Sequence, residues 1–128
     1  MASEMGKPVT QGVAEIEKCA LLCRWYAENA VQMLKPERRD SLARTSYVCK
    51  EPQGIILGIM PWNFPFWQVF RFMVPVLTGG NAALLKHASN VPQCAPAIEE
   101  IVKESGFGRE LAVEGIREFV NIKTINVM

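Results

Sequence analysis

Apolar side chains recur at three- and four-residue intervals along residues 9–34, and this period predicts one long amphipathic helix. The side chains expected on its buried stripe are Val13, Ile16, Ala20, Cys23, Ala27 and Val31. Residues 43–50 alternate well enough to predict a strand, with a turn over residues 35–40 before it and another over residues 51–54 after it.

The second half of the chain contains short, continuously apolar runs. Residues 55–60 and 82–86 predict two buried strands, and residues 65–78 and 92–104 predict a helix after each of them. Residues 118–127 predict a final strand. The order strand, helix, strand, helix is typical of a βαβα unit, in which the two strands run parallel.

Composition excludes several functional classes. The 128 residues are 49% hydrophobic and carry a formal net charge of +1, so neither nucleic acid nor an anionic surface is an expected partner. No basic start precedes an apolar run, and Arg71 interrupts the longest apolar stretch, so neither a signal peptide nor a membrane span is expected. Cysteines that look unpaired fit a reducing compartment, and we expect a cytoplasmic protein.

The four cysteines, together with the single histidine, make a poor set of metal ligands. Cys19 and Cys23 lie one helical turn apart, Cys49 follows a strand-like segment, and Cys94 lies in an alanine-rich helix. Free cysteines commonly behave as small buried hydrophobes. We therefore expect all four to be structural, and we expect no metal site.

The corner between the first buried strand and its helix carries an amide side chain, Asn63. Pro61 restricts the backbone before it, and Pro65 suits the first turn of a helix. An amide held there could donate a hydrogen bond to a developing negative oxygen, as in an oxyanion hole. The local pattern alone favours a cap on the following helix, which is the commoner use of asparagine in such a position.

Longer motifs surround this corner. Residues 51–67 read EPQGIILGIMPWNFPFW, and residues 75–88 read PVLTGGNAALLKHA. Both stretches resemble the aldehyde dehydrogenase superfamily. The start of the chain, EMGKP at residues 4–8 with AEIEKC at residues 14–19, resembles its succinate-semialdehyde branch. The tail, GFGREL at residues 106–111 and EFVNIKT at residues 118–124, resembles the extreme C-terminus of the same enzymes.

The sequence departs from this family in length, because family members are several times longer. Residues 98–107 resemble a family helix that leads into a third strand, whereas residues 105–111 resemble the family's last loop. Both contain Ser-Gly-Phe, so an internal deletion joined there would give this sequence, and the start also reads as clipped. The family's nucleophilic cysteine, its general-base glutamate and its glycine-rich turn are not recognisable. We therefore expect this chain alone to be inactive.

The resemblance implies roles for particular side chains. Asn63 corresponds to the family's oxyanion stabiliser, and Lys86 to the lysine that contacts the adenosine ribose. The residues expected near the cofactor are Met60, Pro61, Trp62, Lys86 and Ser89. Many family members carry a glutamate at the position of Ser89, which disfavours NADP, so either NAD or NADP is expected, with weak or no binding. Without the family context, Lys86 reads as a solvated lysine at a strand end, and His87 reads as a surface or ribose-edge residue.

Together, these features predict an α/β fold that contains a partial Rossmann-like βαβα unit, the N-terminal helix and strands of the family's oligomerisation region. The expected parts are residues 1–53 (helix and strand), 54–104 (nucleotide-binding unit) and 105–128 (C-terminal loop and oligomerisation strand). The resemblance implies a small aldehyde, such as succinate semialdehyde, as substrate. It also leaves open an interaction module that forms homo-oligomers or joins full-length homologues, and a truncated product without function.

Overall fold

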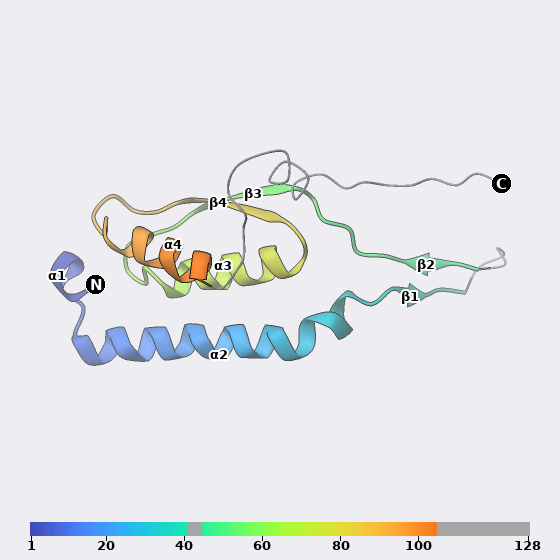
Figure 1. The fold of residues 1–128 in the computed structure, drawn as a ribbon, viewed down its shortest axis with the longest axis horizontal. Helices are drawn as coiled ribbons and strands as arrows, with labels where there is room; N and C mark the ends of the chain where they lie inside the picture. Colours follow the sequence, from blue (N-terminus) through green and yellow to red (C-terminus); the bar gives the residue numbers. More distant parts are fainter. Residues whose placement is uncertain (41–44, 105–128) are drawn as a thin grey trace.

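The computed structural model describes residues 1–40 and 45–104 (Figure 1). Its elements are α1 (Ala2–Met5), α2 (Val9–Leu34), β1 (Glu37–Arg38), β2 (Tyr47–Val48), β3 (Ile55–Ile59), α3 (Trp67–Thr78), β4 (Ala82–Lys86) and α4 (Cys94–Glu104). The long helix, the two apolar strands and the two later helices are therefore confirmed, with ends that differ by at most two residues. The strand predicted over residues 118–127 lies outside the described residues, as does the whole C-terminal part predicted over residues 105–128.

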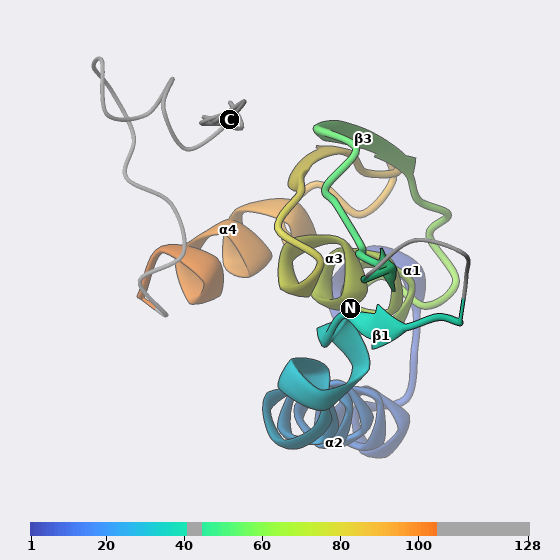
Figure 2. The ribbon, with the colours of Figure 1, turned by 90° about the vertical axis from the view of Figure 1, so that its right-hand side faces the viewer.

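Strands β3 and β4 form a parallel pair, which confirms the strand direction predicted from the element order. Ile55 lies opposite Ala82, and the register continues to Ile59 opposite Lys86. Helix α3 connects the two strands and packs on one face of their sheet (Figure 2). Helix α2 packs on α3 from the side away from the sheet, so the order of layers is sheet, α3, α2.

The buried core lies around the N-terminal half of α3. Its members come from α2, from α3 and its N-cap, from α4 and from the segment before α4: Cys19, Phe66, Val69, Phe70, Val91, Cys94 and Ile98. The helices thus meet at the end of α3 that follows the β3 corner, and this fixes the corner against the rest of the fold.

The stripe predicted for the long helix is confirmed only in its middle, where Ala20 and Cys23 are half-buried and Cys23 packs against the core. The buried residues of α2 are Gly12, Glu15 and Cys19, whereas Val13 is 53% exposed and Val31 is 74% exposed. A buried glutamate cannot be placed by counting apolar positions. The carboxylate of Glu15 binds the start of α3, and this contact turns the Gly12–Cys19 side of the helix inward.

The two parallel strands, predicted as buried, are covered on one face only. Gly58 faces α3 and is buried, whereas the alternate positions are exposed. These exposed apolar side chains are Ile55, Leu57, Ile59 and Leu84. Within the described residues, α3 covers only one face of the sheet, so the other face is left open.

The segment predicted as a turn over residues 35–40 instead contains a strand. Glu37–Arg38 pairs antiparallel with Tyr47–Val48, which is all that is observed of the strand predicted over residues 43–50, whose first two residues lie outside the described part. The Lys50 Nζ atom lies 2.6 Å from the Glu37 carboxylate and supports the pairing. A two-residue strand of charged side chains has no alternating pattern by which it could be predicted.

In residues 1–40 and 45–104, no helix combines the length and the apolar character that crossing a membrane requires.

Candidate functional site

The candidate nucleotide site lies where β3 and β4 end side by side. The Met60 amide donates a hydrogen bond to the Lys86 carbonyl oxygen at 3.0 Å, directly after the last paired residues of the two strands. In parallel sheets, ligands bind beyond the carboxyl ends of the strands. The structure therefore brings the Met60–Trp62 segment and Lys86 to the sheet edge at which a ligand is expected.

Most of the predicted site residues are open to solvent. Trp62 is 49% exposed, and Pro61, Asn63, Lys86 and Ser89 are also exposed. Met60 is half-buried and packs against the core. The site is thus an edge of the sheet that is accessible to solvent and is attached to the core through Met60.

The side chain of Lys86 shares the open face of the sheet. Lys86 pairs with Ile59, and paired residues of neighbouring strands project from the same face. Ile59 is 67% exposed, and Lys86 is exposed as well. A cation therefore stands at the end of an otherwise apolar, uncovered surface.

Asn63 does not cap α3. The N-cap residue is Phe66, which makes no side-chain capping bond, and the Asn63 amide hydrogen-bonds to nothing within the described part of the chain. The helix-cap interpretation of Asn63 is therefore wrong. The exposed amide is free to donate to a ligand.

The start of α3 is instead capped by Glu15, from a distant part of the sequence. Its Oε1 atom accepts hydrogen bonds from the amides of Phe66 and Trp67, each at 2.9 Å. Its Oε2 atom pairs with the Lys7 ammonium, which also stands 4.0 Å from the centre of the Phe64 ring. Sequence reasoning missed this cap, because nothing local to Glu15 shows a partner 51 residues away, and the role of Lys7 depends on that of Glu15.

This cap also prevents a phosphate from binding at the N-terminus of α3. Helix N-termini commonly hold anions through their free amides and positive dipole end. In α3, the carboxylate of Glu15 already occupies the amides of Phe66 and Trp67. A nucleotide at this edge therefore gains no phosphate cradle from those two amides.

His87 ties the end of β4 to the same corner. Its Nδ1 atom accepts a hydrogen bond from the Ala88 amide at 2.8 Å, so the other nitrogen carries the proton in the neutral ring. That Nε2 atom donates to the Pro65 carbonyl oxygen, also at 2.8 Å. His87 is half-buried, and its reading as a surface or ribose-edge residue stays a prediction.

The cysteines occupy different environments. Burial, with the nearby Glu15 charge, raises the pKa of Cys19 to about 12, and burial also raises the pKa of Cys23 and of Cys94. Cys49 is exposed. Across residues 1–40 and 45–104, no group of three or more histidine, cysteine, aspartate or glutamate side chains is arranged to hold a metal ion.

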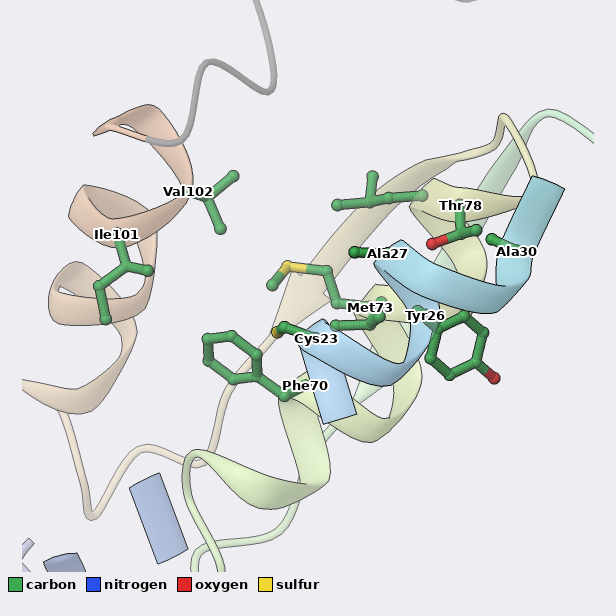
Figure 3. Close-up of a pocket in the computed structure, with 11 residues that line it drawn as sticks. Cys23, Tyr26, Ala27, Ala30, Phe70, Met73, Thr78, Ile101 and Val102 are labelled. Carbon is green, nitrogen blue, oxygen red and sulfur yellow. The ribbon is translucent and has the colours of Figure 1, made fainter. Parts of the chain in front are cut away.

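An apolar cavity of about 550 Å³ lies among α2, α3 and α4 (Figure 3). Its lining comes from the second half of α2, from α3 and from the end of α4: Cys23, Tyr26, Ala27, Ala30, Phe70, Met73, Val74, Leu77, Thr78, Ile101 and Val102. Cavities of this size can hold small molecules. None of these eleven described residues is charged, so they offer no partner to a phosphate or a carboxylate.

Known proteins are similar to this chain in both sequence and fold. A probable succinate-semialdehyde dehydrogenase (NADP(+)) of Synechocystis sp. is 56% identical over 107 residues, which are 84% of this chain and 24% of that protein. The succinate semialdehyde dehydrogenase (NAD(P)+) of Escherichia coli is 50% identical over 103 residues, which are 80% of this chain and 22% of that enzyme. The chain thus spans about a quarter of the length of these relatives.

A solved structure agrees with these relatives. The crystal structure of succinic semialdehyde dehydrogenase from Streptococcus pyogenes, in complex with NADP+ as the cofactor, matches with a TM-score of 0.78 and 36% identity. The match covers 82% of this chain and 23% of that one. The profile of the aldehyde dehydrogenase family matches residues 1–109. Since that match takes in most of the sequence, the chain belongs to the aldehyde dehydrogenase family.

Proposed function

We propose that this chain forms the adenosine side of the NADP or NAD site of an aldehyde dehydrogenase, on a partial Rossmann-like βαβα unit. The observation that carries the proposal is the hydrogen bond from the Met60 amide to the Lys86 carbonyl oxygen. It joins the two segments that the family resemblance assigns to the cofactor, at the carboxyl ends of parallel strands. Lys86 would contact the adenosine ribose, beside Pro61 and Trp62.

The proposal extends to the choice of cofactor. Ser89 stands where a glutamate would repel the additional phosphate of NADP, and its side chain is exposed. The names of the Synechocystis and Escherichia coli relatives include NADP(+) and NAD(P)+. We infer that NADP is accepted at this edge at least as well as NAD.

The substrate proposed for the family site is a small aldehyde, with succinate semialdehyde as the first candidate, oxidised to the acid while hydride passes to the nicotinamide. Asn63 is the residue proposed to stabilise the oxyanion, because its exposed amide has no partner in the described chain. The 128 residues contain no recognisable nucleophile loop or general base. We therefore expect binding without turnover.

The test is a calorimetric titration of the purified chain with NADP and with NAD. Because Glu15 occupies the α3 amides, we expect at best millimolar affinity, about 4 kcal/mol. Lys86→Ala should weaken both cofactors, and Ser89→Glu should weaken NADP more than NAD. Lys35→Ala is the matched control, since Lys35 is an exposed cation at the end of α2. Sub-micromolar binding that survives Lys86→Ala would refute this placement.

A second assay tests turnover. The chain should produce no NADPH or NADH from succinate semialdehyde at any cofactor concentration, because loss of a nucleophile and its base removes many powers of ten in rate. Turnover that disappears on substitution of a single cysteine would identify that cysteine as a nucleophile and overturn the expectation.

A second function is favoured by the exposed apolar surface. The uncovered sheet face carries Ile55, Leu57 and Ile59, and Tyr47 and Val48 in β2 are also exposed. Strands with unpaired edges and open apolar faces gain by joining another chain. We propose that the chain self-associates, or joins a full-length homologue, through residues 43–50 and 118–127.

Light scattering of the chain, alone and mixed with a full-length homologue, tests association. Removal of residues 118–128 should abolish it. A chain that stays monomeric at high concentration and ignores the homologue rules association out. If it is also readily degraded by protease and binds no nucleotide, the remaining reading is a truncated product without function.

A further inference from the structure

The corner that carries Trp62 and Asn63 is held by side chains from outside the βαβα unit. Glu15 in α2 accepts hydrogen bonds from the Phe66 and Trp67 amides, both at 2.9 Å. Lys7, which precedes α2, pairs with the other oxygen of the same carboxylate. The N-terminal segment and α2 therefore reach the corner through one buried ion pair.

This ion pair is buried deeply. Lys7 is 8% exposed and Glu15 is 5% exposed. Buried charges are costly unless each is paired and its hydrogen bonds are satisfied. Here the carboxylate meets that condition, because both of its oxygens have partners and two of the bonds come from helix-terminal amides.

A helix can be capped far more simply. A serine or aspartate at the N-cap position would satisfy the same amides locally, but α3 has Phe66 there and no side-chain cap of its own. A local cap would add no hydrogen bond between the preceding turn and α2, which would then be joined only by the apolar core. A cap supplied by Glu15 also fixes the position of that turn relative to α2.

Lys7 extends this restraint toward Asn63. Its Nζ atom stands 4.0 Å from the centre of the Phe64 ring, and Phe64 directly follows Asn63. Pro65 is held separately by His87 at the end of β4. Phe64, Pro65 and Phe66 are each held by a different group, so the backbone that leaves Asn63 has little freedom.

We propose that Glu15 and Lys7 are positioning residues, which hold the Trp62–Asn63 turn in the orientation that the cofactor and the aldehyde require. This rests on the proposed function in one respect, namely that the turn carries those contacts. Neither residue touches the ligand. Each acts through the backbone and ring of residues 64–67.

The test compares three variants of the full chain at matched global stability, with denaturant adjusted for each. Glu15→Ala removes the cap and the ion pair, whereas Glu15→Gln keeps an oxygen that can accept from the two amides. Cys19→Ala is the matched control, because Cys19 is buried one turn along the same helix and makes no bond to the corner. NMR would follow the Phe66 and Trp67 amides, the Asn63 side-chain amide and the Trp62 indole.

The expected result has two parts. In Glu15→Ala, the Phe66 and Trp67 amides exchange at least about tenfold faster than in Cys19→Ala, and the Asn63 and Trp62 signals shift. In Glu15→Gln, the exchange rates and the Asn63 and Trp62 signals stay close to those of the unsubstituted chain. NADP affinity falls at least about threefold in Glu15→Ala and is unchanged in the control.

Equal exchange and equal spectra in Glu15→Ala and Cys19→Ala would overturn the proposal, since they would show Glu15 to be an ordinary core contributor. If the unsubstituted chain binds no NADP, the proposed function fails. The exchange rates and the Asn63 and Trp62 signals then still decide whether Glu15 positions the turn. Lys7→Met, which keeps the length of the side chain, should give a smaller shift of the Asn63 signal in the same direction.

Discussion

The ring of Phe72 in α3 covers Gly58 in β3 so closely that no side chain fits between them. A Cβ atom on residue 58 would lie 2.5 Å from the Phe72 Cε1 atom and 2.8 Å from two further ring atoms. This close approach brings α3 against the inner face of the sheet. It therefore fixes the distance between α3 and β3, and with it the position of the corner that joins them and carries the candidate site.

Gly58→Ala should lower the free energy of unfolding by about 1–3 kcal/mol, because the aromatic ring has to move away from the strand. Urea unfolding followed by circular dichroism measures this. Gly12→Ala, at a helical glycine whose added Cβ would meet only the end of the Met1 side chain at 3.4 Å, should be neutral or stabilising. If Phe72→Leu fails to recover stability in the Gly58→Ala background, the ring is not the cause.

Local sequence patterns predicted most of the secondary structure. The apolar period over residues 9–34 and the short apolar runs at residues 55–60 and 82–86 are strong signals, and the structure has elements at all three. The family resemblance grouped Met60 with Lys86 near the cofactor, and a backbone hydrogen bond joins these two residues in the structure.

Contacts between distant residues were not predictable in this way. The inward face of α2 is set by Glu15, and its partner amides at Phe66 and Trp67 lie 51 and 52 residues away. A glutamate between apolar residues reads as a solvated position until its partner is known. The same holds for His87, whose bond to Pro65 spans 22 residues.

Asn81 should contribute strongly to stability, because one side chain joins three backbone groups. Its Oδ1 atom accepts from the amides of Gln53 at 2.6 Å and Gly54 at 3.0 Å, and its Nδ2 atom donates to the Val76 carbonyl at 3.3 Å. Asn81→Ala should cost about 2–3 kcal/mol of unfolding free energy, whereas Asn81→Asp keeps the acceptor and should cost less.

Asn29→Ala is the control for Asn81, because Asn29 makes an exposed bond to the Trp25 carbonyl within α2. It should change the free energy of unfolding by no more than about 0.5 kcal/mol. Thermal or urea unfolding of the three variants in one buffer makes the comparison. Equal losses for Asn81→Ala and Asn29→Ala would show that the bridge to residues 53 and 54 contributes nothing.

Stability should depend on pH through Glu4. A hydrogen bond from the Gln93 amide, 2.7 Å from Oε1, lowers the pKa of this carboxyl below 4.5. A carboxyl whose folded pKa is depressed stabilises the fold above its unfolded pKa, and this stability is lost as pH falls through the folded value. The unfolding midpoint in urea should therefore fall between pH 5 and about pH 3.

Glu4→Gln should flatten that acid-side loss, because the substituted side chain no longer titrates. Glu99→Gln is the control, since Glu99 forms an exposed ion pair with Lys103 on α4. Urea midpoints at several pH values from 7 to about 3 give the slopes. If the slope of Glu4→Gln matches that of the unsubstituted chain, other carboxyls dominate the acid transition.

Alkylation should distinguish Cys49 from the other cysteines. The thiolate is the reactive form, and a pKa of about 12 for Cys19 leaves roughly a thousandth of the thiolate that its ordinary value of 9.0 would give. Burial also raises the pKa of Cys23 and of Cys94, whereas Cys49 is exposed beside β2. In native buffer, iodoacetamide should modify Cys49 first, as read by mass spectrometry of peptides.

Cys49→Ser should remove the fast phase of this reaction, and urea should make all the remaining thiols react. Native-state labelling of Cys19 as fast as that of Cys49 would mean that α2 leaves the core often enough to expose it, contrary to its tight packing beside Glu15.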